Sequence, residues 1–497
     1  MSTLLLGPIL GYESEASGAN AHYTCLIVTS NTTPLWMVDG MRVSFAKLAD
    51  AATEGAVWRA EWPVPTNRPA GRQIEYTVEA SGKIAHTTRG EAQWRFYLPA
   101  TGESIRFVYG SCNGFSALKL MASTAEPHKM WEAMVKDHAA QPLSLLVLGG
   151  DQVYADAIWE QDWMRDFAEL TDAQMKEFAV TPEMEMKMDP FYEGLYRRQW
   201  SAPPVAAMLA SVPSIMMWDD HDIFDGWGSH PPIVQDCVVY KRIYQSALRA
   251  FRLFQLRGNL ACGFLAPGAK HHAYVTVLNG ENFLMLDHRT ERTPAVVMSD
   301  NQWDAFKEWL KTFSGRRLFI QSAVPVIYRT FGLIERALAT TNNREELEDD
   351  LNDHWSAREH QKERLRLIYS FIGRQQVLHD ADKNYDPHWL FLSGDVHVGC
   401  MGSVWEKDLD LGLYQVVSSG LVHPPPTMLQ WLGIRAVSGD GDDRLGNGEL
   451  VAEIHPIAGA ASKFLRTRNY ARLELEPKGI WINWRCENGD ETVFRIS

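Results

Sequence analysis

The chain has 497 residues, of which 45% are hydrophobic, 22% charged and 11% aromatic, a balance typical of a folded globular protein. Its formal net charge of −14 disfavours binding to nucleic acid or to an anionic membrane through long-range electrostatics. A polyanionic substrate therefore needs a locally positive site, which bound metal ions can supply.

The length of the chain predicts two or more domains. Within residues 1–100, short apolar or alternating runs are separated by Gly, Asn and Pro turns, and these runs are HYTCLIVTS, RQIEYTVEA and AQWRFYLP. They indicate a small N-terminal β-sandwich domain. We expect residues 98–104 to act as a linker and residues 101–497 to form a second, catalytic domain.

After residue 104, short buried strands alternate with longer helical stretches, which predicts an α/β arrangement. The predicted strands are 105–109, 143–148, 214–218, 283–287, 317–322, 389–393 and 414–418, with further strand-like runs at 471–477 and 480–486. A helix is predicted at 340–370. Residues 155–200 form a helical insertion rich in Met and acidic residues, which either packs as a subdomain or covers the site as a lid.

Polar clusters follow four of the predicted strands directly, and they lie at 110–113, 149–156, 219–222 and 394–397. In α/β sheets, functional sites form beyond the carboxyl ends of the strands. Clusters that are far apart in sequence can therefore meet at one place.

The side chains in these clusters form a plausible metal cage. Five of them, when ionised, carry five negative charges that one trivalent and one divalent ion would balance: Cys112, Asp151, Tyr154, Asp220 and Asp395. Anionic Asp, Tyr and Cys suit trivalent iron, and all-oxygen positions suit Ca²⁺, Mg²⁺ or Mn²⁺. Each cluster alone has an ordinary structural explanation, as a turn, a helix cap or a buried side chain, but their joint occurrence favours a metal site.

These motifs resemble those of the calcineurin-like metallophosphatases. Residues 150–156, Gly-Asp-Gln-Val-Tyr-Ala-Asp, are similar to the purple acid phosphatase motif in which the Tyr is an iron ligand. Cys112 stands where an acidic ligand is usual, Asp220 where Asn is usual, and Asp395 where the last motif has its first His. That set of departures resembles the alkaline phosphatase D (PhoD-like) family, as do the stretches at 7–17, 286–292, 299–303 and 353–355.

The resemblance implies a metallophosphatase fold, with two packed mixed β-sheets flanked by helices. It also implies that Fe³⁺ is held by Cys112, Asp151, Tyr154 and His397. Asp151 would bridge to a divalent ion that Asp220 and Asp395 also hold. The anionic ligands of this second position favour Ca²⁺, with Mn²⁺ and Zn²⁺ as alternatives. The wider superfamily has a further histidine at the second metal, and the candidates for it here are His288, His354 and His423.

The implied reaction is attack on phosphorus by a metal-bridging hydroxide. We expect His221 to protonate the leaving oxygen and Asp222 to orient its imidazole. Arg289 and Arg292 follow another predicted strand and are candidates to grip phosphate oxygens, or else are ordinary ion-paired arginines.

The sequence thus predicts a metal-dependent phosphoesterase that hydrolyses phosphate monoesters, diesters or both. A mononuclear iron oxygenase and a non-catalytic binding protein with a vestigial metal site are the alternatives. Six scattered cysteines without a Cys-x-x-Cys pair, and an N-terminus without a basic or twin-arginine signal, predict a cytoplasmic protein without a membrane span. An exported form whose signal has been removed is the alternative. We expect small phosphate esters as partners and no stable nucleic-acid complex, and the sequence does not indicate the oligomeric state.

Overall fold

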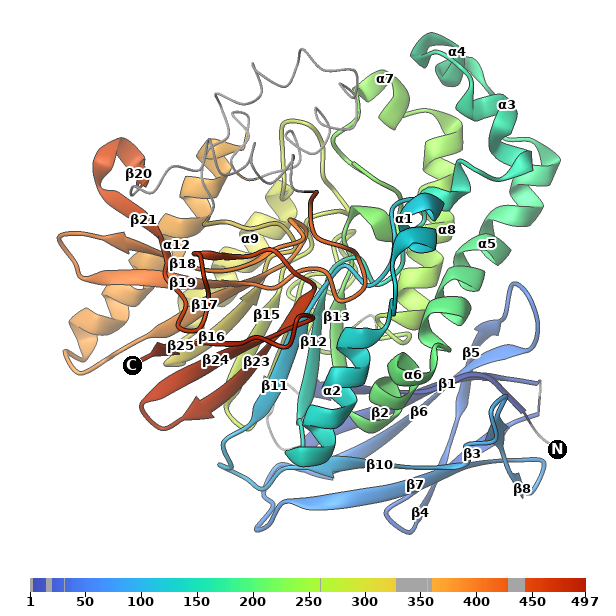
Figure 1. Ribbon diagram of the computed structural model, residues 1–497, viewed down its shortest axis with the longest axis horizontal. Helices are drawn as coiled ribbons and strands as arrows, with labels where there is room; N and C mark the ends of the chain where they lie inside the picture. The colour runs from blue at the N-terminus through green and yellow to red at the C-terminus, as the bar shows by residue number, and fades with distance from the viewer. Residues whose placement is uncertain are drawn as a thin grey trace.

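The computed structural model describes residues 3–14, 20–30, 32–259, 261–327, 355, 360–427 and 443–497. Within these residues the chain forms two large mixed β-sheets that pack face to face, with helices on their outer sides and a smaller third sheet at one end (Figure 1). This arrangement confirms the predicted α/β metallophosphatase fold. No helix in the described ranges is long and apolar enough to cross a membrane.

The first large sheet has a parallel centre made of β11 (Arg106–Gly110), β12 (Leu145–Gly149) and β13 (Ser214–Met217). These strands are short and almost entirely buried, as expected for parallel strands covered on both faces. The antiparallel strands beside β11 are, in order, β23 (Asn469–Glu476), β24 (Gly479–Cys486) and β25 (Glu491–Ile496).

The second large sheet has a parallel centre of four strands, which are β15 (Glu281–Met285), β16 (Arg317–Gln321), β17 (His388–Ser393) and β19 (Leu411–Val417). The antiparallel strands at its edges are β14 (Tyr274–Leu278), β18 (Gly399–Glu406), β20 (Asp443–Leu445), β21 (Leu450–His455) and β22 (Phe464–Leu465). Aromatic rings join the two sheets: Phe107 of β11 lies 5.2 Å from Phe283 and 4.8 Å from Phe319, measured between ring centroids.

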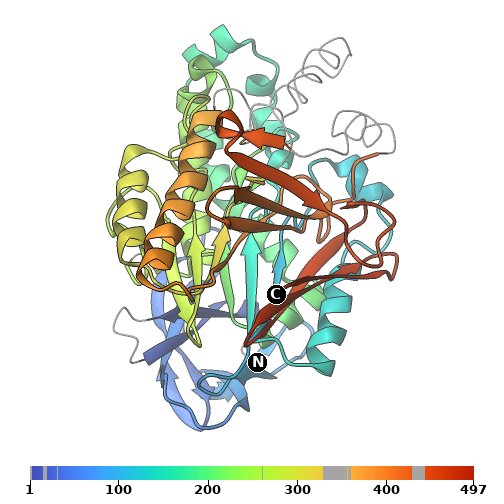
Figure 2. The same ribbon diagram turned by 90° about the vertical axis from the view of Figure 1, so that its left-hand side faces the viewer.

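Helices cover the outer face of each sheet (Figures 1 and 2). Those beside the first sheet are α2 (Lys129–Ala140), α5 (Pro182–Trp200), α6 (Pro203–Ser211) and α8 (Val238–Phe254). Those beside the second are α9 (Asp300–Thr312) and α12 (Gln361–Ala381). The predicted helix at 340–370 lies largely outside the described residues, and its residues 361–370 belong to α12.

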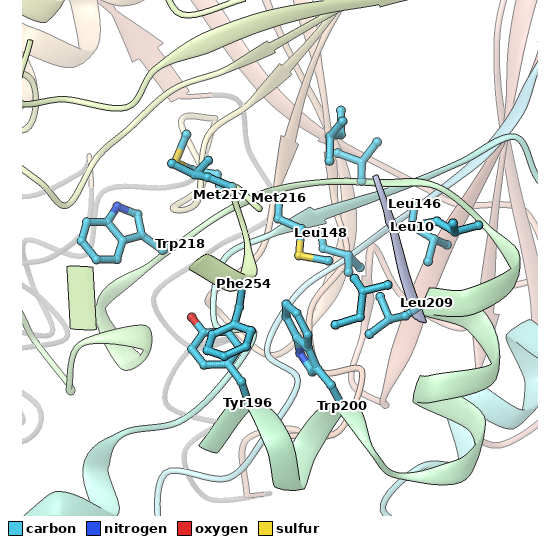
Figure 3. Packing of buried hydrophobic residues seen from close by; sticks show 14 of the residues in the cluster. Leu10, Leu146, Leu148, Tyr196, Trp200, Leu209, Met216, Met217, Trp218 and Phe254 are labelled. Carbon is cyan, nitrogen blue, oxygen red and sulfur yellow. The ribbon is translucent and has the colours of Figure 1, made fainter. Parts of the chain in front are cut away.

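A dense apolar core lies between the first sheet and its helices. Figure 3 shows Tyr196 and Trp200 of α5 with Phe254 of α8 beside residues of β12 and β13. The rings of Tyr196 and Phe254 stack with centroids 4.9 Å apart. The carboxyl ends of β12 and β13 are therefore fixed by packing, and these ends carry the candidate site.

The N-terminal region forms the predicted sandwich. One layer is β1 (Thr3–Ser14), β2 (Asn20–Thr29), β6 (Ala56–Pro65) and β5 (Ala46–Asp50), and the other is β10 (Gln93–Leu98), β7 (Arg72–Ala80), β3 (Pro34–Val38) and β4 (Met41–Ser44), with the short β8 (Lys83–Ile84) and β9 (His86–Thr87) beside β7 and β1. Tyr23 and Phe96 stack between the two layers at 5.2 Å. The first layer continues into the first large sheet, because Gly11 of β1 pairs in parallel with Ser214 of β13. The division into domains at residue 100 stays a prediction.

The insertion at 155–200 carries, besides α5, the short helices α3 (Arg165–Ala168) and α4 (Asp172–Glu177). Its aromatic side chains pack inward: Tyr192 and Tyr196 are buried, and Trp159 lies edge-on against Phe224, with ring centroids 5.1 Å apart. These contacts are those of a packed helical layer. A lid function for this segment stays a prediction.

Candidate metal centre

Loops at the carboxyl ends of strands from both large sheets bring the predicted residues together. Cys112 and Asp151 follow β11 and β12, whereas Asp395 and His397 follow β17. All four have left-handed backbone conformations, with φ of 55°, 52°, 66° and 52° respectively. Such values are uncommon outside glycine, cost about 1–3 kcal/mol each, and cluster at functional sites.

One group of side chains is centred on Asp151. Its Oδ2 lies 3.3 Å from Sγ of Cys112 and 3.5 Å from the hydroxyl of Tyr154. The Tyr154 hydroxyl is in turn 3.5 Å from Nε2 of His397. A thiol, a carboxylate, a phenol and an imidazole therefore face one another, and this donor set suits trivalent iron.

A second group is made of carboxylates. Ligand atoms of Asp151, Asp219, Asp220 and Asp395 all lie within 4.8 Å of one another, and the same holds for Asp151, Asp220 and His221. Asp151 thus belongs to both groups. Its Oδ1 is buried and has no hydrogen-bond partner among the described residues, which fits an oxygen that a metal ion would bind.

The charges of this cluster also fit bound cations. Burial raises the pKa of Cys112, of Tyr154 and of Asp151 well above their ordinary values, and neighbouring anions raise them further. Without a counter-cation the anionic forms are therefore strongly disfavoured. Metal ions would reverse this, because their charge stabilises the deprotonated ligands.

Arg289 places one positive charge beside the cluster of carboxylates. Its fully buried guanidinium pairs with Asp219 through Nε and lies 3.4 Å from Oδ1 of Asp220 through Nη2. Nη1 donates to the Trp227 carbonyl at 3.2 Å. The structure therefore favours a role for Arg289 in holding these carboxylates over the predicted grip on phosphate. Arg292 is 95% buried, and its side chain lies against Gly228.

His221 is held by two neighbours. Its Nδ1 lies 2.8 Å from Oδ2 of Asp156, and its ring stacks on Tyr154 with centroids 4.3 Å apart. Burial alone would lower the pKa of His221, but the carboxylates of Asp156 and Asp220 raise it well above its usual value. In the metal-free site these carboxylates therefore favour the protonated form of the imidazole.

Asp222 has a different place from the one expected. Its Oδ1 accepts hydrogen bonds from the backbone N–H groups of Gln152 and Val153, at 3.0 and 3.1 Å, and from Nε2 of Gln255 at 2.9 Å. Its Oδ2 accepts from the backbone of Asp219 at 2.9 Å. Asp222 thus fixes two ligand loops against each other, and Asp156 takes the position beside His221 that the sequence predicted for Asp222.

Of the three candidate extra histidines, His423 lies beside the site. Its ring stacks on His397 with centroids 3.7 Å apart, and burial lowers the pKa of His423 to about 4. His288 instead packs edge-on against Trp355, at 5.3 Å between centroids. His354 lies outside the described residues.

Sequence reasoning gave no role to Asp156, Asp219 or the ring stack of His423. Asp156 and Asp219 lie within the polar clusters at 149–156 and 219–222. The sequence pattern therefore marked their loops, but it did not distinguish metal ligands from the residues that position them. His423 belongs to no motif that was recognised.

With this geometry in view, comparison with known proteins decides the family. The profile of a family described as PhoD related phosphatase matches residues 84–343, just over half of the chain. The chain belongs to the PhoD related phosphatase family. This confirms the resemblance drawn from the motifs.

Two further matches are a curated relative and a solved structure. An uncharacterized protein of Saccharomyces cerevisiae is 27% identical in an alignment of 377 positions that covers 63% of this chain and 52% of the yeast protein. The chain thus spans about half the length of that relative. A solved structure of PhoD matches with a TM-score of 0.59 at 14% sequence identity, over 99% of this chain and 92% of the other, and shows that the fold is shared.

Proposed function

We propose that this chain is a metal-dependent phosphoesterase with a binuclear centre that hydrolyses phosphate monoesters, diesters or both. The observation that carries the proposal is Asp151, which belongs to both groups of ligand atoms in a chain of the PhoD related phosphatase family. A carboxylate shared in this way is suited to bridge two ions.

Two sets of side chains would hold the ions. Cys112, Asp151, Tyr154 and His397 form the donor set for Fe³⁺. Asp151, Asp220 and Asp395 offer oxygen ligands for a divalent ion, which favours Ca²⁺, with Mn²⁺ and Zn²⁺ as alternatives. When bound, the ions supply positive charge that polarises the phosphoryl group and makes water a better nucleophile.

The protein's own part in the chemistry centres on His221. Its proton on Nδ1 is fixed by Asp156, so its Nε2 is the atom that would give a proton to the leaving oxygen. General acid catalysis of this kind contributes ~10²–10⁴-fold to the rate. His221 also lies close enough to Asp151 and Asp220 to serve as a ligand instead.

The Asp219–Arg289 pair supports the second set of ligands. Because Asp219 is paired with a fully buried guanidinium, its carboxylate is already neutralised. We therefore assign Asp219 to positioning Asp220, its neighbour in the chain, and leave the divalent ion to the three carboxylates named above.

The deciding experiment combines elemental analysis with hydrolysis of p-nitrophenyl phosphate and bis-p-nitrophenyl phosphate. Wild-type protein should contain two metal ions per chain and turn over at least one ester, and Asp151→Asn should lose both metal and activity. Asp236→Asn, which changes an exposed carboxylate 3.1 Å from Lys241, is the matched control and should behave as wild type.

The other outcomes are equally informative. Protein that stays inactive and metal-free after addition of Fe, Ca, Mn and Zn would identify a vestigial site. Retention of both ions by Asp151→Asn would remove the bridging role. If His221→Ala lowers turnover but keeps both ions, His221 is the acid, whereas loss of an ion would make it a ligand.

A further inference from the structure

Two aromatic side chains of the candidate iron site stack on the ring of His423. The ring of His423 lies 3.7 Å from that of His397, with only 16° between the ring planes. On the Tyr154 side the centroids are 5.6 Å apart and the planes differ by 19°. The His423 ring therefore stacks on two of the four side chains that form the iron donor set.

Hydrogen bonds fix the edge of the His423 ring. Nδ1 lies 2.8 Å from the carbonyl oxygen of Pro424, which can only accept, so this nitrogen carries the proton in the neutral ring. Nε2 is then the acceptor, and it lies 3.2 Å from the hydroxyl of Ser116. Both nitrogens are thus engaged with Ser116 and Pro424 and are not directed at the metal ligands.

The backbone holds the ring in the same place. The amide of His423 donates to the Cys112 carbonyl at 3.2 Å, and the residue is 93% buried. The loop that carries His423 is therefore tied to the loop that carries a candidate ligand. His397 itself sits at a φ of 52°, with its amide donating to Oγ of Ser419 at 3.0 Å.

We propose that His423 is a positioning residue whose ring face fixes the orientation of His397 and Tyr154 toward Asp151, and so sets the affinity of the iron site. This inference rests on the proposed function. An imidazole ligand that is free to rotate about its side-chain bonds loses that freedom on binding metal, and a stacked ring removes most of it beforehand. Supporting residues of this kind are worth about 10–100-fold in metal affinity or activity.

The effect should be selective for one ion. The ring of His423 contacts Tyr154 and His397, and its amide donates to the Cys112 carbonyl. The carboxylate of Asp220, in the second set of ligands, instead accepts a hydrogen bond from the backbone N–H of Gly226. A general loss of structure would weaken both ions, whereas loss of the stack should weaken iron alone.

The test compares two substitutions in the full chain. His423→Ala removes the ring, and His423→Phe keeps a flat ring but loses both hydrogen bonds. Iron affinity is measured by competition with a chelator, the second ion by elemental analysis, and the Tyr154 bond by the visible tyrosinate-to-iron charge-transfer band. His86→Ala, at a partly exposed histidine of the N-terminal sandwich, is the matched control.

We expect His423→Ala to weaken iron binding by about 10–100-fold, to shift the charge-transfer band and to leave the second ion in place. His423→Phe should recover most of the iron affinity. Where the Ala variant does not fold, His423→Leu replaces it, because leucine fills space without offering a flat ring.

Equal loss in the Phe and Ala variants would show that a ring nitrogen is needed, which overturns the stacking role in favour of the two hydrogen bonds or of ligation. Unchanged iron affinity in His423→Ala would overturn the inference alone and leave the phosphoesterase intact. Wild-type protein that binds no iron would remove the proposed iron site, and this inference with it.

Discussion

The carboxylate of Asp156 lies 2.8 Å from Nδ1 of His221 and also accepts a hydrogen bond from the backbone N–H of Asp225 at 2.9 Å. The contact with His221 fixes which of its nitrogens bears the proton, and the hydrogen bond from Asp225 holds the carboxylate in place. A carboxylate that orients an imidazole and stabilises its protonated form is a recurrent arrangement for proton transfer.

Asp156→Asn should therefore impair the proton transfer more than the metal site. The loss should depend on the leaving group, because p-nitrophenolate departs readily without a proton and phenolate does not. We expect turnover of phenyl phosphate to fall by ~10²-fold, and that of p-nitrophenyl phosphate to fall much less. Steady-state kinetics with both esters measures the difference.

Asp225→Asn is the control for this prediction, because the Asp225 carboxylate is 3.8 Å from Nε2 of His221 and partly exposed. It should have a smaller effect. Equal losses on both esters in Asp156→Asn, or loss of a metal ion, would mean that Asp156 supports the ligand cluster instead.

Arg289→Met should destabilise the metal-free protein strongly. It leaves the buried carboxylate of Asp219 without its cation, and breaking a buried pair in this way costs about 3–5 kcal/mol. Urea unfolding of metal-free protein measures the change. Adding Asp219→Asn should restore part of the loss, because the uncompensated charge is then gone.

Arg165→Met is the matched control, since its partner Asp162 is exposed and such surface pairs contribute about 0–1 kcal/mol. If Arg289→Met unfolds at the same urea concentration as the control, then the Asp219–Arg289 pair is not a source of stability.

Metal binding should release protons. In the metal-free protein, burial raises the pKa of Cys112, Asp151 and Tyr154 above their ordinary values, so these groups hold protons that a metal ion must displace. Affinity should therefore fall as the pH falls. Calorimetric titration of metal-free protein in buffers with different ionisation enthalpies counts the protons released, and a pH-independent affinity without proton release would contradict the assigned ligands.

Much of the site could be predicted from sequence because the carboxyl ends of parallel strands meet at one edge. Short apolar runs in the sequence predicted β11, β12, β13 and β17. Because polar residues follow each of these strands directly, they were expected to lie near one another at that edge. Cys112, Asp151, Tyr154 and His397 are brought together on this basis.

Side-chain direction within these loops was not predictable. Asp220–Asp222 form a 3₁₀ turn, which points Asp222 back at the backbone of Gln152 and leaves His221 to Asp156. Long-range pairing was also hidden. Gly11 pairs in parallel with Ser214, and Arg289 forms an ion pair with Asp219. Nothing in the local sequence around either partner indicates these contacts.

His138, near the end of α2 and outside the site, makes stability depend on pH. Its Nδ1 accepts a hydrogen bond from the backbone N–H of Leu143 at 3.1 Å, and burial together with the charge of Arg95 lowers the pKa of His138 from 6.5 to about 4. The unfolded chain therefore binds a proton more readily than the folded one. The stability that His138 contributes is complete above pH 6.5 and is lost as the pH falls from there to about 4. Because the side chain is partly exposed, we expect the free energy of unfolding to fall by about 2 kcal/mol over this pH range.

Urea unfolding of metal-free wild type and His138→Gln at several pH values isolates this loss, since glutamine keeps an acceptor for Leu143 but does not titrate. Parallel pH profiles for the two proteins would show that His138 is protonated equally in the folded and unfolded states.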